Sequence, residues 1–174
     1  MTNLARLNVR SAEPAEANAV LDVLNEAAGW LSQRRIRQWP SSFQREWLEP
    51  ALSDGRVLLG RLNGTIVATA TLAWTDPLWP DDHSAGYLHF FAVRRDAAGL
   101  GAELLTWVTT AVQEHGRRLL RLDCPADNTP LRTYYERVGF RHVCDVQLPR
   151  AAALWSPPGT LLSLYERYLN DLSA

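Results

Sequence analysis

The sequence predicts one domain of the α/β (α+β) class, in which a mixed sheet carries helices on both faces. Its 174 residues suffice for one domain, which buries roughly 70% of the surface of the unfolded chain. The hydrophobic fraction of 47% and the charged fraction of 21% are typical of globular proteins. Strand-like and helix-like segments follow one another in the order βααββ and then βαβαββ, which predicts the mixed sheet.

Apolar spacing and turn residues predict each element of the first half. Val20, Leu24 and Leu31 recur at helical spacing, and Ser11 precedes them as a candidate N-cap. Asn63-Gly64 tolerates the positive φ angles of a two-residue hairpin turn. The predicted elements are a strand at 7–10, a helix from 11 to about 33, a short helix after Ser41-Ser42, and strands at 56–62 and 65–74.

The second half alternates strands and helices. Gly116 and Gly139 each end a helical pattern, and Pro130 stands in the first turn of a helix that begins at Asn128. The predicted elements are a loop at 76–86, strands at 87–93 and 119–124 with a helix at 99–115 between them, a helix at 128–139, and strands at 140–148 and 161–169. For 161–169 a helix is the alternative.

The charged residues exclude several function classes. All 18 basic residues are arginine, which excludes a lysine Schiff base and the lysine of a nucleotide-binding phosphate loop. A net charge of −1 argues against nucleic acid or an anionic membrane as a partner. No apolar run resembles a signal peptide or a membrane span, so we expect a cytoplasmic protein with reduced cysteines.

Two segments carry chemistry. Residues 90–93 form the end of a strand that turns through Gly99 and Gly101 into a helix, a geometry that presents backbone N–H groups to an anion. Alone, this pattern is also that of an ordinary strand-to-helix turn. The second segment comprises Leu122-Asp123-Cys124, Asn128, Tyr134-Tyr135-Glu136 and Gly139-Phe140.

With both segments in this order, the sequence resembles the GNAT superfamily of N-acetyltransferases. The resemblance is close over residues 87–140, where the strand–loop–helix pyrophosphate motif and the Asn…Tyr-Glu-x-x-Gly-Phe segment both match. Residues 36–39, 88–89 and 122–124 also resemble a subgroup common in actinobacteria. The resemblance implies one acetyltransferase-like domain over 1–174 and a mostly antiparallel sheet that is splayed between two parallel central strands.

The resemblance further implies an acetyl-CoA-dependent enzyme that transfers acetyl directly to the primary amine of a small molecule. In this interpretation Tyr135 protonates the departing thiolate, and Asn128 contacts the pantetheine arm. The other cofactor-binding residues are backbone partners of pantetheine (Phe91, Ala92 and Val93), backbone amides for the pyrophosphate (Ala98, Gly99, Leu100, Gly101 and Ala102) and candidate phosphate-binding cations (Arg94 and Arg95).

Helix and strand periodicity select the candidate acid and base. Tyr134 shares the helix face of Leu131 and Val138, so we expect Tyr134 in the core and Tyr135 in the cleft. On the preceding strand, simple alternation places residues 87, 89 and 91 on one face. His89 titrates near neutrality and is the candidate general base, with a packed histidine as the alternative.

The acceptor pocket is less defined by the sequence. Aromatic rings and carboxylates attract ammonium groups, and the loop region supplies both kinds. The candidates are Trp39, Asp76, Trp79, Asp81 and Asp82, with a solvated loop as the alternative.

The cofactor loop departs from the family pattern. It is about two residues shorter than is usual, and Asp96 stands where a basic or amide side chain is expected. Asp96 would repel a pyrophosphate unless Arg95 faces the phosphates instead. A non-catalytic module that binds an acyl-CoA or another metabolite is therefore the alternative function.

No metal site is predicted. His142 and Cys144 share a strand face, but two ligands without a second pair are a weak signal. Cys124 is predicted to be a packing residue rather than a nucleophile. A homodimer formed through an edge strand is a further expectation.

Overall fold

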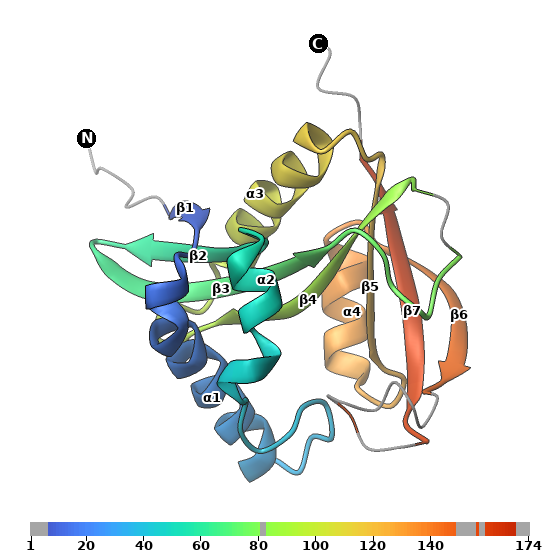
Figure 1. Cartoon of the computed structure of the whole chain (residues 1–174). Coiled ribbons are helices and arrows are strands. Elements are labelled where there is room, and N and C mark those ends of the chain that lie inside the picture. Colours follow the sequence, from blue (N-terminus) through green and yellow to red (C-terminus); the bar gives the residue numbers. More distant parts are fainter. Residues whose placement is uncertain (1–6, 81–82, 149–155, 157–158, 170–174) are drawn as a thin grey trace, which may run out of the picture.

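The computed structural model describes residues 7–80, 83–148, 156 and 159–169, and these form a seven-stranded sheet with helices on both faces (Figure 1). The strand order is β1-β2-β3-β4-β5-β7-β6. Neighbouring strands are antiparallel except for β4 and β5, which are parallel. The predicted fold class is confirmed.

The elements follow the predicted order. The strands are β1 (Asn8–Ser11), β2 (Val57–Leu62), β3 (Thr65–Ala73), β4 (Ala85–Val93), β5 (Leu119–Pro125), β6 (Arg141–Gln147) and β7 (Leu161–Tyr168). The α-helices are α1 (Ala17–Gln33), α2 (Glu49–Ser53), α3 (Gly101–Glu114) and α4 (Thr129–Arg137), and the 3₁₀ turns are η1 (Pro14–Glu16), η2 (Arg45–Trp47) and η3 (Arg95–Ala97).

Ser11 is not the N-cap that its position suggested. It is the last residue of β1, and its Oγ donates a hydrogen bond to the carbonyl of Gly55. The turn η1 lies between β1 and α1, so the helical segment begins only at Pro14. The short helix predicted after Ser41-Ser42 also begins later, as η2 followed by α2.

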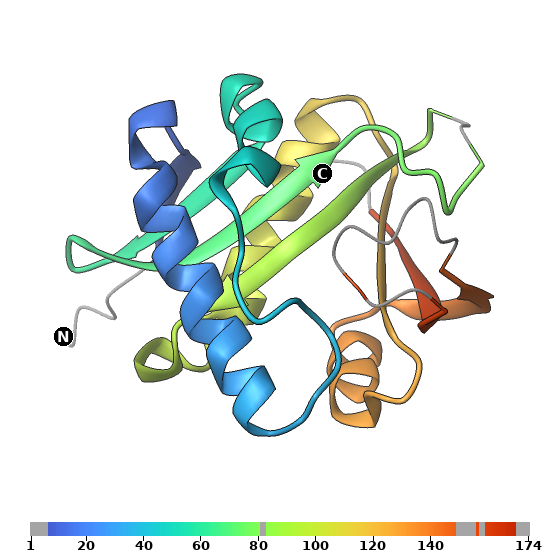
Figure 2. The ribbon, with the colours of Figure 1, turned by 60° about the horizontal axis from the view of Figure 1, so that its bottom comes forward.

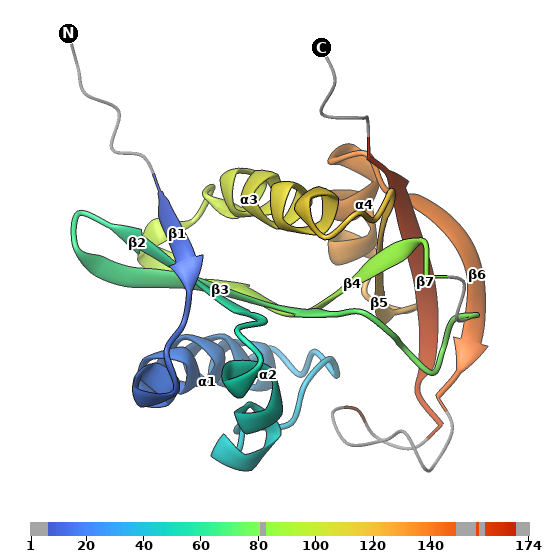
Figure 3. The same ribbon diagram turned by 45° about the horizontal axis from the view of Figure 1, so that its top comes forward.

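Two apolar layers hold the helices against the sheet. Helices α1 and α2 cover one face, and α3 and α4 cover the other (Figure 3). Helix α1 packs Val20 and Leu24 against the first face, where they share a cluster with Leu59 of β2. Helix α3 packs Leu104 and Val108 against the opposite face. Burial of these side chains on both faces fixes the helices relative to the strands.

Strands β4 and β5 are paired at one end only. Their ladder joins 85–87 to 119–121 and then stops, while β4 stays paired with β3 as far as Val93. Beyond the ladder the two strands diverge (Figure 2). The splayed, parallel central pair that the family resemblance implies is therefore present.

A β-bulge in β4 lies where the strands diverge. Thr71 of β3 is opposite His89, and Thr69 is opposite Ala92, so one β3 residue faces two residues of β4. One of these two, Phe90, has φ +48°, an angle that bulky side chains rarely adopt. Bulges raise the local twist of a strand and disrupt its ladder.

The bulge overturns the expectation that residues 87, 89 and 91 share one face of β4. Phe91 packs instead against the cluster that contains Leu88 and the α3 side chains, on the opposite face from His89. Alternation is valid only in an uninterrupted strand, and the additional residue reverses it after Phe90.

Helix α4 buries a wider stripe than the sequence suggested. Tyr135, expected to be turned away from the core, is 6% exposed, whereas Leu131, Tyr134 and Val138 are only partly buried. Tyr135 packs edge-on against both Tyr134 and Phe140. An apolar helix face spans more than 100°, so adjacent tyrosines can both point inward.

No helix within the described ranges is long and apolar enough to cross a membrane.

Gly86 lies where β4 contacts α3, and it has no room for a side chain. A methyl group there would lie 2.6 Å from Cγ2 of the fully buried Val112. We expect Gly86→Ala to lower the free energy of unfolding by about 1–3 kcal/mol, because a packed core resists added volume. Urea denaturation measures this change.

Gly29→Ala is the matched control. Gly29 lies in α1 with no atom within 4 Å of the added methyl, so this variant should be up to about 1 kcal/mol more stable than the parent. Equal stability of the two variants would contradict the close packing of β4 on α3.

Candidate active site

The segment that joins β4 to α3 presents free backbone amides. The turn η3 leads to Gly99, whose φ of +102° only glycine adopts readily, and α3 begins two residues later. Within the described chain, the amides of Gly99, Gly101 and Ala102 have no hydrogen-bond acceptor, whereas those of Ala98 and Leu100 donate to nearby carbonyls. Free amides at a helix N-terminus suit an anion, as predicted for a pyrophosphate.

Both predicted phosphate-binding arginines contact helix α1. Arg94 donates to the carboxylate of Glu26 and to the carbonyl of Ile66. The guanidinium of Arg95 lies over the ring of Trp30, 4.4 Å from its centre, and its backbone N–H donates to Glu26. Asp96, between them and Gly99, is exposed. A contact from either arginine to phosphate stays a prediction.

Asn128 caps helix α4 and connects two distant segments. Its Oδ1 accepts a hydrogen bond from the amide of Leu131, and its Nδ2 donates to Oε1 of Gln38 over 3.2 Å. Gln38 also accepts a hydrogen bond from Ser156 at its carbonyl. The predicted contact of Asn128 with pantetheine stays a prediction.

A cavity of about 300 Å³ lies where β4 and β5 diverge. It brings together three of the predicted site residues, Tyr135, His89 and Phe91, with Asp76 and Trp39 of the predicted acceptor pocket. Trp79 lies elsewhere, packed against Tyr87 and under the guanidinium of Arg121. Asp81 and Asp82 lie outside the described residues.

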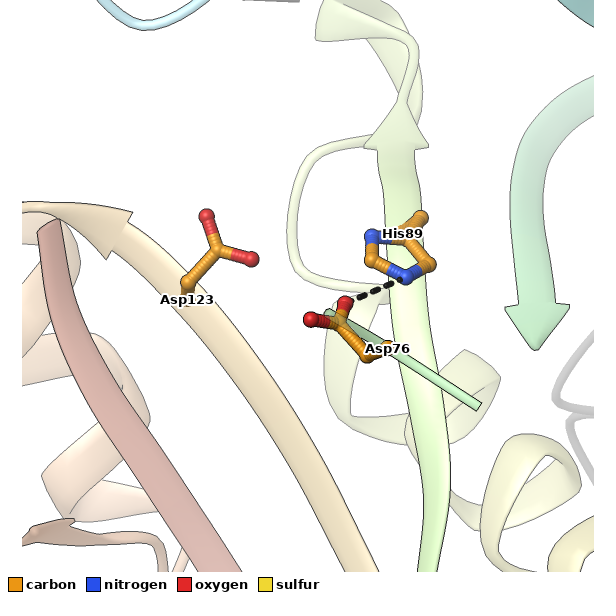
Figure 4. A group of neighbouring side chains, drawn as sticks. All are labelled: Asp76, His89 and Asp123. Atoms are coloured by element: carbon orange, nitrogen blue, oxygen red, sulfur yellow. Dashed lines mark ion pairs between the residues drawn. The ribbon is translucent and has the colours of Figure 1, made fainter. Parts of the chain in front are cut away.

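His89 belongs to a cluster of three ionisable side chains (Figure 4). Its Nε2 lies 3.2 Å from Oδ2 of Asp76, while Oδ1 of Asp76 accepts a hydrogen bond from the amide of Leu78. Nδ1 of the same ring is turned toward Asp123 of β5 (Figure 4). Asp76 therefore fixes the orientation of the imidazole and leaves Nδ1 directed into the cluster.

Burial and neighbouring charges shift the pKa values of His89 and Asp123. Burial alone would lower the pKa of His89, but the hydrogen bond to Asp76 and the negative charge of Asp123 raise it above the ordinary value. Burial raises the pKa of the Asp123 carboxyl, although His89 opposes this shift. The imidazole therefore stays protonated to a higher pH than a histidine in water.

The ligand atoms of Asp76, His89 and Asp123 all lie within 4.8 Å of one another, so this set could also hold a metal ion. Two carboxylates with one imidazole are a donor set that divalent metals accept. Sequence reasoning did not single out this set.

The two adjacent tyrosines of α4 have different surroundings. Burial raises the pKa of Tyr135, and its hydroxyl makes no hydrogen bond to any described residue. The hydroxyl of Tyr134 lies against Gly101, where an added methyl would be 2.6 Å from it, and it also lacks a hydrogen-bond partner there. Only Tyr135 lines the cavity.

Sequence reasoning missed two cavity residues, Thr71 and Asp123, as site residues. Asp123 interrupts the apolar strand β5, and a lone carboxylate in such a strand is a signal that could have identified it. Thr71 is next to His89 only because of the register between β3 and β4.

The predicted packing role of Cys124 agrees with its surroundings. Its side chain lines the cavity but is only 2% exposed, and burial raises the pKa of its thiol to about 12. His142 does not turn toward Cys144 but lies 2.7 Å from the carboxylate of Asp145.

We expect one fast-reacting thiol in the folded protein. Cys144 is exposed, whereas Cys124 is buried and stays protonated near neutral pH because of its raised pKa. Titration with a disulfide reagent at pH 8 should give one thiol per chain, and two after denaturation in guanidinium. Two fast thiols in the folded protein would contradict the buried position of Cys124.

Known proteins share both the sequence pattern and the fold. The model of the acetyltransferase (GNAT) family matches residues 24–140. A protein of Bacillus subtilis (strain 168) named "Uncharacterized N-acetyltransferase YesJ" is 30% identical over 137 residues, which are 72% of this chain and 76% of that protein.

Solved structures agree with the fold. A GNAT-family acetyltransferase from Listeria monocytogenes superposes with a TM-score of 0.73 at 24% identity, covering 94% of this chain and 95% of the other. The putative acetyltransferase yncA from Salmonella typhimurium, solved with its cofactor acetyl-CoA, has a TM-score of 0.70 at 16% identity, covering 98% of each chain. The sequence model of the acetyltransferase (GNAT) family matches more than half of this sequence, so the chain belongs to that family.

Proposed function

We propose that this protein transfers the acetyl group of acetyl-CoA directly to the primary amine of a small molecule. The observation that carries the proposal is the cavity at the divergence of β4 and β5, which places the phenol of Tyr135 and the imidazole of His89 around one space. Family membership supports acetyl transfer, and the Salmonella relative contains acetyl-CoA.

The chain has groups that fit the two ends of acetyl-CoA. The free amides at Gly99, Gly101 and Ala102 suit the pyrophosphate. The edge of β4 after the bulge is not paired with β5, which leaves backbone groups for the amides of pantetheine. Phe91, at the bulge, lines the cavity where the acetyl group would lie.

In the proposed reaction, the amine nitrogen forms a bond to the thioester carbonyl carbon, and the carbon–sulfur bond breaks. The amine loses a proton to Nδ1 of His89, whose Nε2–H is held by Asp76. The departing thiolate takes a proton from the hydroxyl of Tyr135. Products are the acetamide and CoA, and both side chains return to their starting states by proton exchange with water.

The surroundings suit these roles. Because burial raises the pKa of Tyr135, the phenol is protonated at neutral pH and has a proton to give to the departing thiolate. The raised pKa of His89 makes the imidazole a stronger base than histidine in water.

Release of CoA tests the proposal. The protein is mixed with acetyl-CoA and a panel of primary amines, and free thiol is measured with time. The proposal requires amine-dependent release for at least one member of the panel. Calorimetric binding of acetyl-CoA without release by any amine would favour the non-catalytic module, and no binding would contradict both functions.

Tyr135→Phe should lower kcat by about 10²–10⁴-fold, because a general acid contributes that much. Affinity for acetyl-CoA should change little, since only the hydroxyl is removed. Tyr134→Phe is the matched comparison, because it removes the neighbouring hydroxyl, which does not line the cavity. An unchanged rate in Tyr135→Phe would contradict the assignment, and loss in Tyr134→Phe alone would transfer the role to that residue.

The pH profile tests His89. Because the imidazole accepts a proton only when neutral, kcat/KM should rise with pH through the pKa of His89, which lies above its ordinary value. Asp76→Asn removes the hydrogen-bonded charge that raises this pKa, so the rising limb should shift to lower pH.

The free amine acceptor ionises in the same way whether it is mixed with the parent or with Asp76→Asn. A difference between the two pH profiles of kcat/KM therefore reports the change in the pKa of the His89 imidazole. Identical rising limbs for the two proteins would contradict a catalytic His89.

A further inference from the structure

One end of the cavity holds two polar groups that make no hydrogen bond to any described residue. The residue Thr71 is 5% exposed, and its Oγ1 makes no hydrogen bond with any described residue. The carboxylate of Asp123 likewise has no hydrogen bond within the described part of the chain, although it lies close to the imidazole of His89. Both residues line the cavity, and Thr71 is the register partner of His89. Buried polar groups normally have partners, so this end of the cavity is suited to a polar ligand.

The charge of this end is negative. Asp76, whose side chain is 6% exposed, and Asp123 stand against the single imidazole of His89. Arg56 also lines the cavity, but its guanidinium donates to the carboxylate of Asp54 and to the carbonyl of Leu72. With a neutral imidazole, the cluster therefore carries two carboxylates and no cation of its own.

A primary ammonium group matches these features. It offers three N–H donors and one positive charge. Asp123 and Thr71 supply unused acceptors, and Asp76 adds a second negative charge beside them. Aromatic side chains, including those of Trp39 and Trp47, also line the cavity and suit an amine whose ammonium group is attached to an apolar part.

We propose that Thr71, Asp76 and Asp123 form an ammonium subsite that selects small organic amines without a carboxylate beside the reacting nitrogen. The inference rests on the proposed function, because the bound ammonium first loses one proton to water, and the resulting amine attacks the thioester and gives its next proton to His89. An α-amino acid is rejected here, because its carboxylate would lie against Asp76 and Asp123.

Binding measured without acetyl-CoA tests the subsite separately from catalysis. The probes are phenethylamine, its neutral counterpart 2-phenylethanol, and phenylalanine, titrated calorimetrically into the full chain after EDTA treatment. The folded parent should bind phenethylamine at least tenfold more tightly than the other two probes.

Asp123→Asn should lower the affinity for phenethylamine at least tenfold and leave that for 2-phenylethanol unchanged. Asp127→Asn is the matched control, because it removes the same charge from an exposed position that does not line the cavity. Its affinities should equal those of the parent.

Thr71→Val keeps the shape of the side chain and removes only the unpartnered hydroxyl. Because that hydroxyl is buried without a hydrogen bond, the variant should melt a few degrees higher than the parent. Its affinity for phenethylamine should nevertheless fall severalfold. A higher melting temperature together with a lower affinity for phenethylamine would show that Thr71 binds the amine, because a variant that folds poorly would melt lower.

Three results would overturn the inference. The first is equal affinity of the parent for phenethylamine and 2-phenylethanol. The second is an unchanged affinity for phenethylamine in both Asp123→Asn and Thr71→Val. The third is tight binding of Zn²⁺ that excludes the amine, because this result would make the cluster a metal site. If phenethylamine binds as expected but no amine releases CoA, the proposed function fails while the subsite stands. If CoA is released but the neutral probe binds equally well, only the subsite fails.

Discussion

The active-site region depends on one additional residue in strand β4. At this β-bulge, two residues of β4 lie opposite one residue of β3, and one of the two, Phe90, has a left-handed backbone conformation. Such a conformation costs about 1–3 kcal/mol and persists only where the surroundings hold it. Phe90 packs edge-on against Phe43, 5.1 Å away, so the segment before α2 supports the bulge. The ladder between β4 and β5 ends just before it, and the cavity occupies the resulting divergence.

The bulge also determines which side chains meet. His89 remains on the face that contacts Asp76, while Phe91 turns to the face of α3 and the segment that joins β4 to α3. In the proposed reaction, this one distortion separates the residues that would face the acceptor from those that would face the thioester. Glu26 then holds the following loop by accepting from Arg94 and from the amide of Arg95, which couples α1 to the start of α3.

Sequence reasoning identified the elements and the family but not the local distortions. Apolar periodicity predicted the strands and helices, and the Asn…Tyr-Glu-x-x-Gly-Phe pattern indicated the family and, through it, the splayed parallel pair. The bulge leaves no signal in the residue types, because Phe90 resembles any strand residue. The side-chain partners of Arg94 and Arg95, Glu26 and Trp30, lie on α1, about 60–70 positions earlier, and only folding brings them together. The position of Thr71 beside His89 follows from the register between β3 and β4, which the sequence alone does not show.

The hydrogen bonds of Gln38 have a consequence for how this protein can diversify. Gln38 joins Asn128 and Ser156, so hydrogen bonds beside the cavity connect three segments that are far apart in sequence. Trp39, Trp47 and Leu148 line the walls of the cavity, whereas the free amides of Gly99, Gly101 and Ala102 lie in the segment between β4 and α3. Under the proposed function, substitutions in the walls would therefore alter the size and shape of the accepted amine while the segment that binds acetyl-CoA stays intact. Acceptor preference and donor binding would then be free to evolve separately on this framework.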